Sequence, residues 1–208
     1  MTNYIKEYGT VLADPPWPYD NKDGPRAAPD HRPNSWDGVT GAVGSSIRYG
    51  SMPIDGLCSL QIPVAEQAQL NLRTTNAILV EAHEVAKAWG FTPKTMLTWG
   101  KVKSDGTPSM KAGYYYRGAT EHVLFGVRGT NIRLAGPPTP TLFLSRRLAH
   151  SVKPAWIYEI AETHSPAPRL ELFARAHRLG WDVWGNEVEN NAMLEEQTCT
   201  PDAPPKWT

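Results

Sequence analysis

The stretch Val11-Leu12-Ala13-Asp14-Pro15-Pro16-Trp17 decides the fold of this 208-residue chain. The short apolar run at 11–13 is typical of a buried strand. The two prolines that follow fix the backbone and cannot continue a sheet ladder, so they predict a rigid loop at the strand's end. Asp14 therefore lies at the carboxyl end of a predicted strand.

Outward from this stretch, strand-like and helix-like apolar patterns alternate along the chain. We expect further strands at 69–74, 95–101, 121–127, 141–144, 170–174 and 181–184, and helices at 53–60, 78–89 and 154–163. In the second helix, apolar residues recur at helical spacing from Ile78 to Trp89, and Gly90 supplies the stop. This alternation predicts an α/β fold with a mainly parallel sheet, whose ligands bind outside the carboxyl ends of the strands.

Composition and charge are those of an ordinary globular domain. The 21 Lys and Arg residues balance 21 Asp and Glu residues, so the formal net charge is zero. Nucleic-acid-binding proteins often carry a basic excess, so such contact would need a local basic patch, a protein partner or a modest footprint. Cys58 and Cys199 suggest neither a disulfide framework nor a zinc site, and no signal peptide or membrane-length apolar run appears. We expect a cytoplasmic protein that binds no membrane.

The residue types at 14–17 suit methyl transfer to an aromatic amine. The lone pair of such an amine is delocalised into the ring, and two hydrogen-bond acceptors on its protons help to free it. Asp14 supplies a carboxylate and Pro15 a carbonyl, Pro16 helps to hold both in place, and Trp17 offers a face on which a base can stack. The alternative is a purely structural turn with Trp17 in the core, and the motif by itself favours neither.

A second polar cluster follows the last two predicted strands. It contains Arg175, His177, Asn186 and Glu187. In a parallel sheet these residues and Asp14 could face one crevice. No His and Cys set has metal-ligand spacing, so we predict no metal site.

Eight segments, in order, resemble one known family: the permuted adenine-N6 methyltransferases related to the catalytic subunit of the messenger-RNA adenosine methyltransferase. The resemblance covers nearly everything from Tyr4 to Glu187 and is nearest to the compact bacterial and phage branch. The segments are 12–17 (LADPPW), 49–52 (YGSM), 88–91 (AWGF), 98–101 (TWGK), 121–129 (EHVLFGVRG), 150–154 (HSVKP), 171–175 (ELFAR) and 181–187 (WDVWGNE).

The resemblance implies a Rossmann-like fold, dependent on S-adenosylmethionine, in which the catalytic loop comes first and the donor-binding strand near the C-terminus. It implies that Asp14 and Pro15 hold the target amine and that Trp17 and Tyr49 line the base pocket. Ser151 would lie on a loop that closes over both ligands.

The same resemblance assigns the donor pocket. Lys153 and Arg175 would contact the methionine carboxylate or the ribose of S-adenosylmethionine, with help from His177. Asn186 and Glu187 would contact the donor's ribose or adenine.

The chain departs from the family pattern at a few positions. Arg73 stands where the family usually has an aromatic residue, and Ile78 where a polar residue is common. Arg178 and Glu187 replace an asparagine and a glutamine of the eukaryotic branch. Arg73 predicts either an exposed sheet edge or a polar contact near the site, and the sequence does not decide between them.

The boundaries and the recognition elements are less marked. We expect a methyltransferase domain over 1–190 and a disordered tail over 191–208. Residues 18–46 and 104–117 are the sizeable loops. The second contains Tyr115, Tyr116 and Arg117, which suit either stacking on unpaired bases or packing at the sheet edge.

The main hypothesis is a methyltransferase that acts on adenine in nucleic acid. DNA is favoured because the loops resemble the compact branch, and RNA is the runner-up because nothing near Asp14 distinguishes deoxyribose from ribose. A catalytically silent nucleic-acid-binding scaffold is the alternative from another class, disfavoured because Asp14, Trp17, Lys153 and Asn186 all remain. A homodimer or another protein partner is compatible with each.

Overall fold

The computed structural model describes residues 6–18, 51–110, 115–130, 132–146 and 153–194. Its strands are β1 (Tyr8–Ala13), β2 (Val64–Thr74), β3 (Thr92–Val102), β4 (Thr120–Arg128), β5 (Leu142–Arg146), β6 (Arg169–Leu172) and β7 (Asp182–Trp184). Its helices are α1 (Ile54–Ser59), the 3₁₀ turn η1 (Asn76–Ile78), α2 (Leu79–Ala88) and α3 (Ala155–His164). Every strand and helix expected from the sequence is present, with shifted ends.

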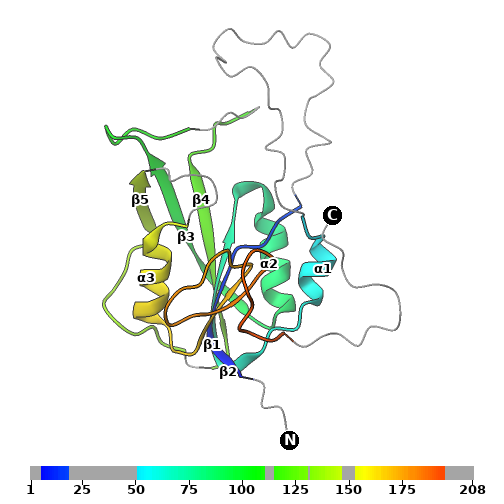
Figure 1. Ribbon diagram of the computed structural model, residues 1–208. Helices are drawn as coiled ribbons and strands as arrows, with labels where there is room; N and C mark the ends of the chain where they lie inside the picture. Colours follow the sequence, from blue (N-terminus) through cyan, green and yellow to red (C-terminus); the bar gives the residue numbers. More distant parts are fainter. Residues whose placement is uncertain (1–5, 19–50, 111–114, 131, 147–152, 195–208) are drawn as a thin grey trace, which may run out of the picture.

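The strands form one seven-stranded sheet in the order β5-β3-β4-β2-β1-β6-β7. Strand β4 is antiparallel to β2 and β3, and the other neighbouring pairs are parallel. The carboxyl ends of the parallel strands and the amino end of β4 therefore share one edge, uppermost in Figure 1 and called here the carboxyl edge. The predicted α/β fold with a mainly parallel sheet is confirmed.

Helices cover both faces of the sheet, and the alternation of side chains along β1 shows which covers which. Val11 belongs to a core cluster with Leu57 of α1 and Val85 of α2. Its neighbour Leu12 belongs to a second cluster with Ile157 of α3. Helices α1 and α2 thus lie on one face and α3 on the other, as Figure 1 shows.

Helix α2 forms where the sequence predicts it. Ala82, Val85 and Ala86 are its buried residues. Gly90 follows the helix with φ +81°, a left-handed conformation that glycine adopts without steric cost and that ends helices. The indole N–H of Trp89 donates to the carbonyl of Leu57 at 2.8 Å, which fixes α1 against α2.

Strand β2 carries buried polar residues between its apolar ones. Gln69 and Asn71 are as buried as Leu70 and Leu72, because helices cover both faces of the sheet. Gln69 accepts a hydrogen bond from the Ser165 hydroxyl at 2.6 Å, just beyond α3. The alternation of apolar and polar residues in the sequence therefore predicts the strand, but its polar residues do not form a solvent-exposed face.

Strand β6 ends earlier than expected. We predict a strand over 170–174, but β6 stops at Leu172 because Phe173 has φ +59°, a left-handed conformation that costs a non-glycine residue about 1–2 kcal/mol. The turn brings the amide of Ala174 to the carbonyl of Trp184 at 3.0 Å. Arg175 therefore leaves the sheet beside the end of β7.

Residues 191–194 lie against the domain. The side-chain oxygen of Asn191 accepts from the amide of Val183 at 2.6 Å, and Ala192 is buried. Residues 195–208 lie outside the described residues, so the boundary at 190 and the disordered tail stay predictions.

Candidate active site

The loop after β1 is held by its own backbone. The amide of Trp17 donates to the carbonyl of Pro15 at 2.9 Å, and the amide of Met52 donates to the carbonyl of Pro16 at 2.9 Å. With φ fixed at both prolines, these bonds leave the loop little freedom. The loop expected at the carboxyl end of β1 is present, and these bonds support the prediction that it is rigid.

Trp17 lies at the far end of this loop and is buried in the core cluster. Its indole N–H donates to the backbone carbonyl of Arg73 at 3.0 Å. The ring thus contributes to packing in this structure. Stacking of a base on it stays a prediction that requires the ring face to become accessible.

Asp14 is the acidic group of the loop, with 26% of its side chain exposed. Its Oδ2 accepts from Nη1 of Arg73 at 2.6 Å and lies 3.9 Å from Nζ of Lys153. Burial opposes ionisation, but the charges of Arg73, Lys153 and Arg175 outweigh it and hold the pKa of this carboxyl below its usual value. In the described part of the chain, Oδ1 of Asp14 accepts no hydrogen bond.

Arg73, near the end of β2, links Asp14 to a second acid. Its Nη2 donates to Oε2 of Glu121 at 2.8 Å, and its own side chain is 12% exposed. Burial disfavours the cation, but the two carboxylates outweigh that effect and raise the pKa of Arg73. The question left open by the sequence is settled: Arg73 makes a polar contact beside Asp14, not an exposed sheet edge.

Glu121 reaches this site because β4 runs opposite to its neighbours. The residue is near the start of β4, which lies at the same edge as the end of β2. Its other oxygen, Oε1, accepts a hydrogen bond from the buried Lys101 of β3. Glu121 is thus a hydrogen-bonding brace between β2 and β3.

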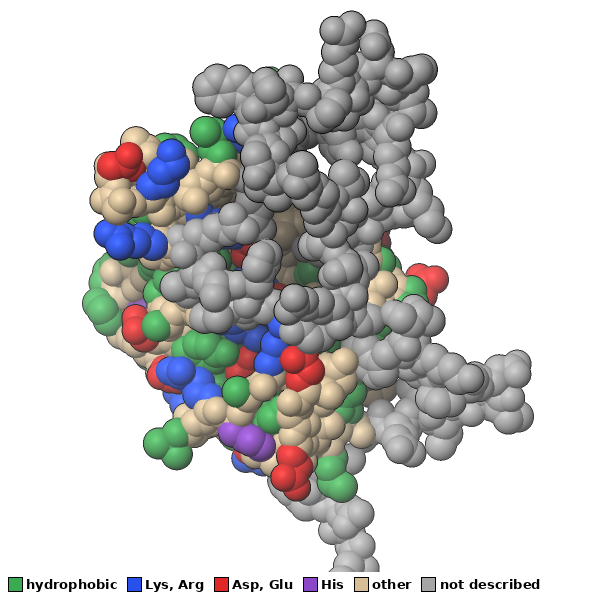
Figure 2. Space-filling model, turned by 45° about the horizontal axis from the view of Figure 1, so that its top comes forward, with side chains coloured by type: hydrophobic (Ala, Val, Ile, Leu, Met, Phe, Trp, Pro, Cys, Tyr) green, Lys and Arg blue, Asp and Glu red, His purple; other side chains and the backbone are tan. Residues whose placement is uncertain are grey.

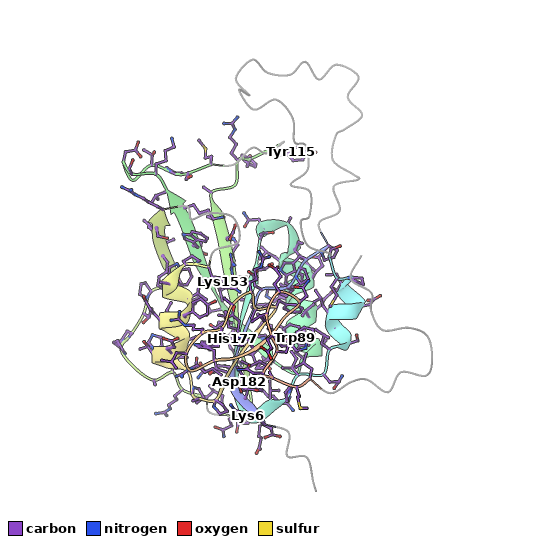
Figure 3. All side chains as sticks on the ribbon, in the orientation of Figure 1. Lys6, Trp89, Tyr115, Lys153, His177 and Asp182 are labelled. Carbon is purple, nitrogen blue, oxygen red and sulfur yellow. The ribbon has the colours of Figure 1, made fainter. Side chains whose placement is uncertain are left out.

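On the other side of Asp14 lies a buried pair. Nζ of Lys153, just before α3, donates to Oε1 of Glu171 on β6 at 2.6 Å. The Tyr158 hydroxyl donates to the same carboxylate at 3.0 Å, and burial, followed by the charge of Glu171, raises the pKa of Tyr158. Figure 3 shows Lys153 above Asp182 and Lys6, which lie toward the opposite edge of the sheet.

Together these residues form an alternating row of charges along the carboxyl edge. From β3 to β6 the row consists of Lys101, Glu121, Arg73, Asp14, Lys153 and Glu171. Figure 2, in which this edge is tilted forward, shows basic side chains directly beside acidic ones next to the atoms drawn in grey. Each charge faces an opposite neighbour, which is the condition for keeping so many ions partly buried.

The second polar cluster lies at the ends of β6 and β7. Nε of Arg175 is 3.5 Å from Oε1 of Glu187, and both side chains are about a third exposed, at 36% and 32%. Asn186 and His177 are exposed nearby in sequence. Two other acids of these strands, Glu171 and Asp182, pair with Lys153 and Lys6.

Lys153 and Arg175 both lie within electrostatic reach of Asp14, and a shared crevice with His177, Asn186 and Glu187 stays a prediction. Tyr49 and Ser151, the two residues expected to bind substrate, lie outside the described residues. Arg178 donates to Glu162 at 2.9 Å and lies over the Tyr158 ring, so this departure from the family supports α3.

Sequence reasoning assigned no site role to three residues of the charge row or its supports: Lys101, Glu171 and Tyr158. Glu171 carried one signal, because a carboxylate between the apolar residues 170 and 172 needs a buried partner. Within the described residues, no group of three or more His, Cys, Asp or Glu side chains could hold a metal ion. Within the same residues, no helix combines the length and apolar character needed to cross a membrane.

Known proteins similar to this chain are methyltransferases. M.MunI of a Mycoplasma species, a type II methyltransferase, is 29% identical over 202 residues, which cover 90% of this chain and 81% of that protein. The MT-A70-like N(6)-adenosine-methyltransferase of Drosophila melanogaster is 24% identical over 94% of this chain. The human METTL3 catalytic subunit of an N(6)-adenosine-methyltransferase is 24% identical over 92% of it. The chain spans only 29% and 30% of the length of these last two proteins.

The family assignment covers the whole sheet. The MT-A70 family matches residues 8–187, which run from the first residue of β1 to beyond the end of β7. The match includes the loop at Asp14, the ion pair of Arg73 with Glu121, and the ion pair of Arg175 with Glu187. The sequence, the seven-stranded α/β fold and this match agree: the chain is a member of the MT-A70 family of methyltransferases.

Proposed function

We propose that this chain transfers a methyl group from S-adenosylmethionine to the exocyclic N6 amine of adenine in DNA. The observation that carries the proposal is the state of Asp14 at the carboxyl end of β1. Its Oδ2 is held by Arg73 at 2.6 Å, its pKa is lowered, and Oδ1 is left without a hydrogen bond in the described part of the chain. A charged acceptor with one oxygen fixed by Arg73 can offer its other oxygen to an incoming N–H group.

The two acceptors needed by the amine are adjacent in the loop. Asp14 Oδ1 would accept one N–H, and the Pro15 carbonyl would accept the other. That carbonyl already accepts from the Trp17 amide at 2.9 Å, but an oxygen with two lone pairs can accept a second bond. Two fixed acceptors draw the amine out of conjugation and free its lone pair for bond formation.

The proton released by the amine also has an acceptor. A methylated aromatic ammonium group is a strong acid, so it can lose its proton even to a weak base. Asp14 is such a base, because Arg73 and Lys153 lower its pKa. Asp14 would take this proton at Oδ1 and pass it to water.

Methyltransferases of this family use S-adenosylmethionine, and the cluster at the ends of β6 and β7 has the chemistry to hold it. When bound, this donor supplies an electrophilic methyl group. Its carboxylate needs a cation, which Arg175 and Lys153 supply, and its ribose and adenine need polar partners, which Asn186 and Glu187 supply. Arg175 and Glu187 are both about a third exposed, so they are accessible to a ligand. His177 would assist at the exposed loop after β6.

DNA is the proposed substrate because the chain belongs with the compact branch. The similarity spans 81% of the type II methyltransferase M.MunI but 30% of human METTL3, which supports the likeness to the compact branch. An adenine amine inside a duplex is out of reach of a rigid loop. The base must therefore be extruded or lie in an unpaired strand, which costs a few kcal/mol, least where the base is mismatched.

The test compares substrates under saturating labelled S-adenosylmethionine. Matched single-stranded and duplex oligonucleotides of DNA and RNA are offered, and N6-methyladenine is measured by mass spectrometry. We expect methylation of DNA that disappears in Asp14→Asn. Faster methylation of RNA would favour the RNA alternative. Normal binding of the donor product without any methylation would favour the silent scaffold.

A further inference from the structure

Residue 73 contacts both ends of the loop at 14–17. Its guanidinium binds Oδ2 of Asp14 at 2.6 Å, and its backbone carbonyl accepts from the Trp17 indole at 3.0 Å. The reaction proposed above involves Arg73 only through its contact with Asp14. A buried arginine in this position needs a reason, because burying its charge is costly unless it is paired.

We propose that Arg73 is a positioning residue for methyl transfer, whose guanidinium fixes Oδ2 of Asp14 and so presents Oδ1 to the target amine. The inference rests on the proposed function, since it concerns the same carboxylate. Arg73 would not touch the substrate. It acts on the orientation and the charge of Asp14.

The guanidinium can do this because it is itself held from the opposite side. Glu121 accepts from Nη2 at 2.8 Å and in turn binds Lys101. Planar arginine with two fixed nitrogens has far fewer orientations available than a flexible ammonium group. Asp14 is thereby anchored through Arg73 to β4 and β3, strands that lie beyond its own neighbour β2.

Distance shows that Arg73 dominates the charges around Asp14. The groups that face this carboxyl are Arg73 of β2, Lys153 before α3, Tyr158 of α3 and Arg175 after β6. Among them Arg73 is in hydrogen-bond contact, whereas Nζ of Lys153 is 3.9 Å away and already bound to Glu171 at 2.6 Å. Loss of Arg73 would therefore leave Lys153 and Arg175 as weaker partners.

The sign of the effect on pH dependence follows from this. Arg73 favours the charged form of Asp14, so its removal raises the pKa of this carboxyl. An adjacent arginine lowers the pKa of an aspartate, so we expect the pKa of Asp14 to rise in Arg73→Met. The acidic limb of the kcat profile should move to higher pH by the same amount.

The experiment compares Arg73→Met, Arg73→Lys and Lys101→Met in the full chain. Methionine keeps an unbranched, flexible stem and removes the charged head group, and Lys101→Met removes the other cation on Glu121 without touching Asp14. The Asp14 carboxyl is titrated by carbon-13 NMR in the free protein, which requires no activity. The kcat and KM for a DNA duplex are then measured across pH.

We expect Arg73→Met to raise the pKa of Asp14 and to lower kcat about 10- to 100-fold, with KM for DNA within about twofold. The pKa of Asp14 and the kcat of Arg73→Lys should fall between those of Arg73→Met and the unmodified protein, and Lys101→Met should leave the pKa of Asp14 unchanged.

Equal shifts of the Asp14 pKa in Arg73→Met and Lys101→Met would overturn the positioning role, as would an unchanged Asp14 pKa in Arg73→Met. If Arg73→Met does not fold, the Arg73→Lys variant tests the proposal. A kcat of Arg73→Lys equal to that of the unmodified protein would contradict the need for two fixed nitrogens. If the unmodified protein methylates no adenine, the proposed function is refuted. The titration of Asp14 would still test whether Arg73 sets the charge of this carboxyl.

Discussion

The two halves of the carboxyl edge are built differently. Around Asp14 the charges are mostly buried and paired at short range, with Arg73 at 2.6 Å from the carboxylate and 12% exposed. Around Arg175 the charges are loosely paired, with Glu187 at 3.5 Å and both side chains about a third exposed, at 36% and 32%. We call these halves the amine side and the donor side, after the roles proposed above: the first is held by close ion pairs, and the second is more exposed to solvent.

This difference indicates how each half would work. A preorganised polar site needs little rearrangement when charge develops, which lowers the barrier to reaction. Exposed polar groups are instead accessible to a ligand, so they contribute to its affinity. Changes on the amine side should therefore reduce kcat, and changes on the donor side should reduce binding of the donor.

The largest effect is expected at Asp14. Asp14→Ala should lower kcat by about 100- to 1,000-fold, the usual loss when one preorganised polar partner is removed, while donor binding stays largely intact. Rates are measured with labelled donor, and affinity for the donor product is measured by calorimetry. Asp55→Ala, on the exposed surface of α1, serves as the control. Near-natural turnover in Asp14→Ala would remove this residue from the mechanism.

The frame of the donor side is tested at Gly185. A Cβ at this residue would lie 2.2 Å from the carbonyl oxygen of Ala174, so Gly185→Ala must push the ends of β6 and β7 apart. We expect a loss of about 1–3 kcal/mol in the free energy of unfolding and weaker donor binding. A Cβ at Gly118 meets nothing within 4 Å, so Gly118→Ala should change stability by less than about 0.5 kcal/mol. Urea unfolding measures both, and equal stability of the two variants would contradict the close approach.

A smaller effect is expected at Asn186. It is exposed at the end of β7, and loss of one hydrogen bond to the donor should weaken affinity about 3- to 10-fold with kcat little changed. Calorimetry of Asn186→Ala against Glu189→Gln, a nearby exposed residue, isolates the contact. Unchanged affinity would take Asn186 out of the donor pocket. Lys153→Ala is also expected to weaken donor binding, but Lys153 lies 3.9 Å from Asp14, so this variant would affect both halves.

The smallest effect is expected at the opposite edge of the sheet. Lys6 binds Asp182 at 2.5 Å, but its side chain is 55% exposed. Lys6→Ala should therefore lower the free energy of unfolding by less than about 1 kcal/mol and leave kcat unchanged. Asp182 keeps the Tyr8 hydroxyl at 2.7 Å as a partner. A change in kcat here would mean that the two edges are coupled.

The sequence predicts the frame of this protein better than its charge row. Strand β1 and helix α2 are local patterns, one a short apolar run and the other a helical repeat ended by Gly90. Arg73 could not be placed in the same way, because its partners Asp14 and Glu121 lie 59 and 48 positions away along the chain. Such pairs depend on the order of strands in the sheet.

The ends of elements show the same limit. Strand β6 stops at Leu172 because Phe173 adopts a left-handed conformation. A phenylalanine in a sequence does not predict that conformation. Gln69 and Asn71 are buried because both faces of β2 are covered, and this follows from tertiary packing alone. The candidate residues Asp14, Arg175 and Glu187 were found by motif and resemblance, and their separate environments emerge from the fold.

The alternating row along the carboxyl edge also bears on ionic strength. Its cations Lys101, Arg73 and Lys153 balance its anions Glu121, Asp14 and Glu171, so the row has no formal net charge. Mobile ions screen buried pairs weakly, whereas they strongly weaken contacts with phosphate groups. Added salt should therefore raise the KM for nucleic acid and leave kcat nearly constant. Salt would weaken substrate binding without slowing methyl transfer on the bound substrate.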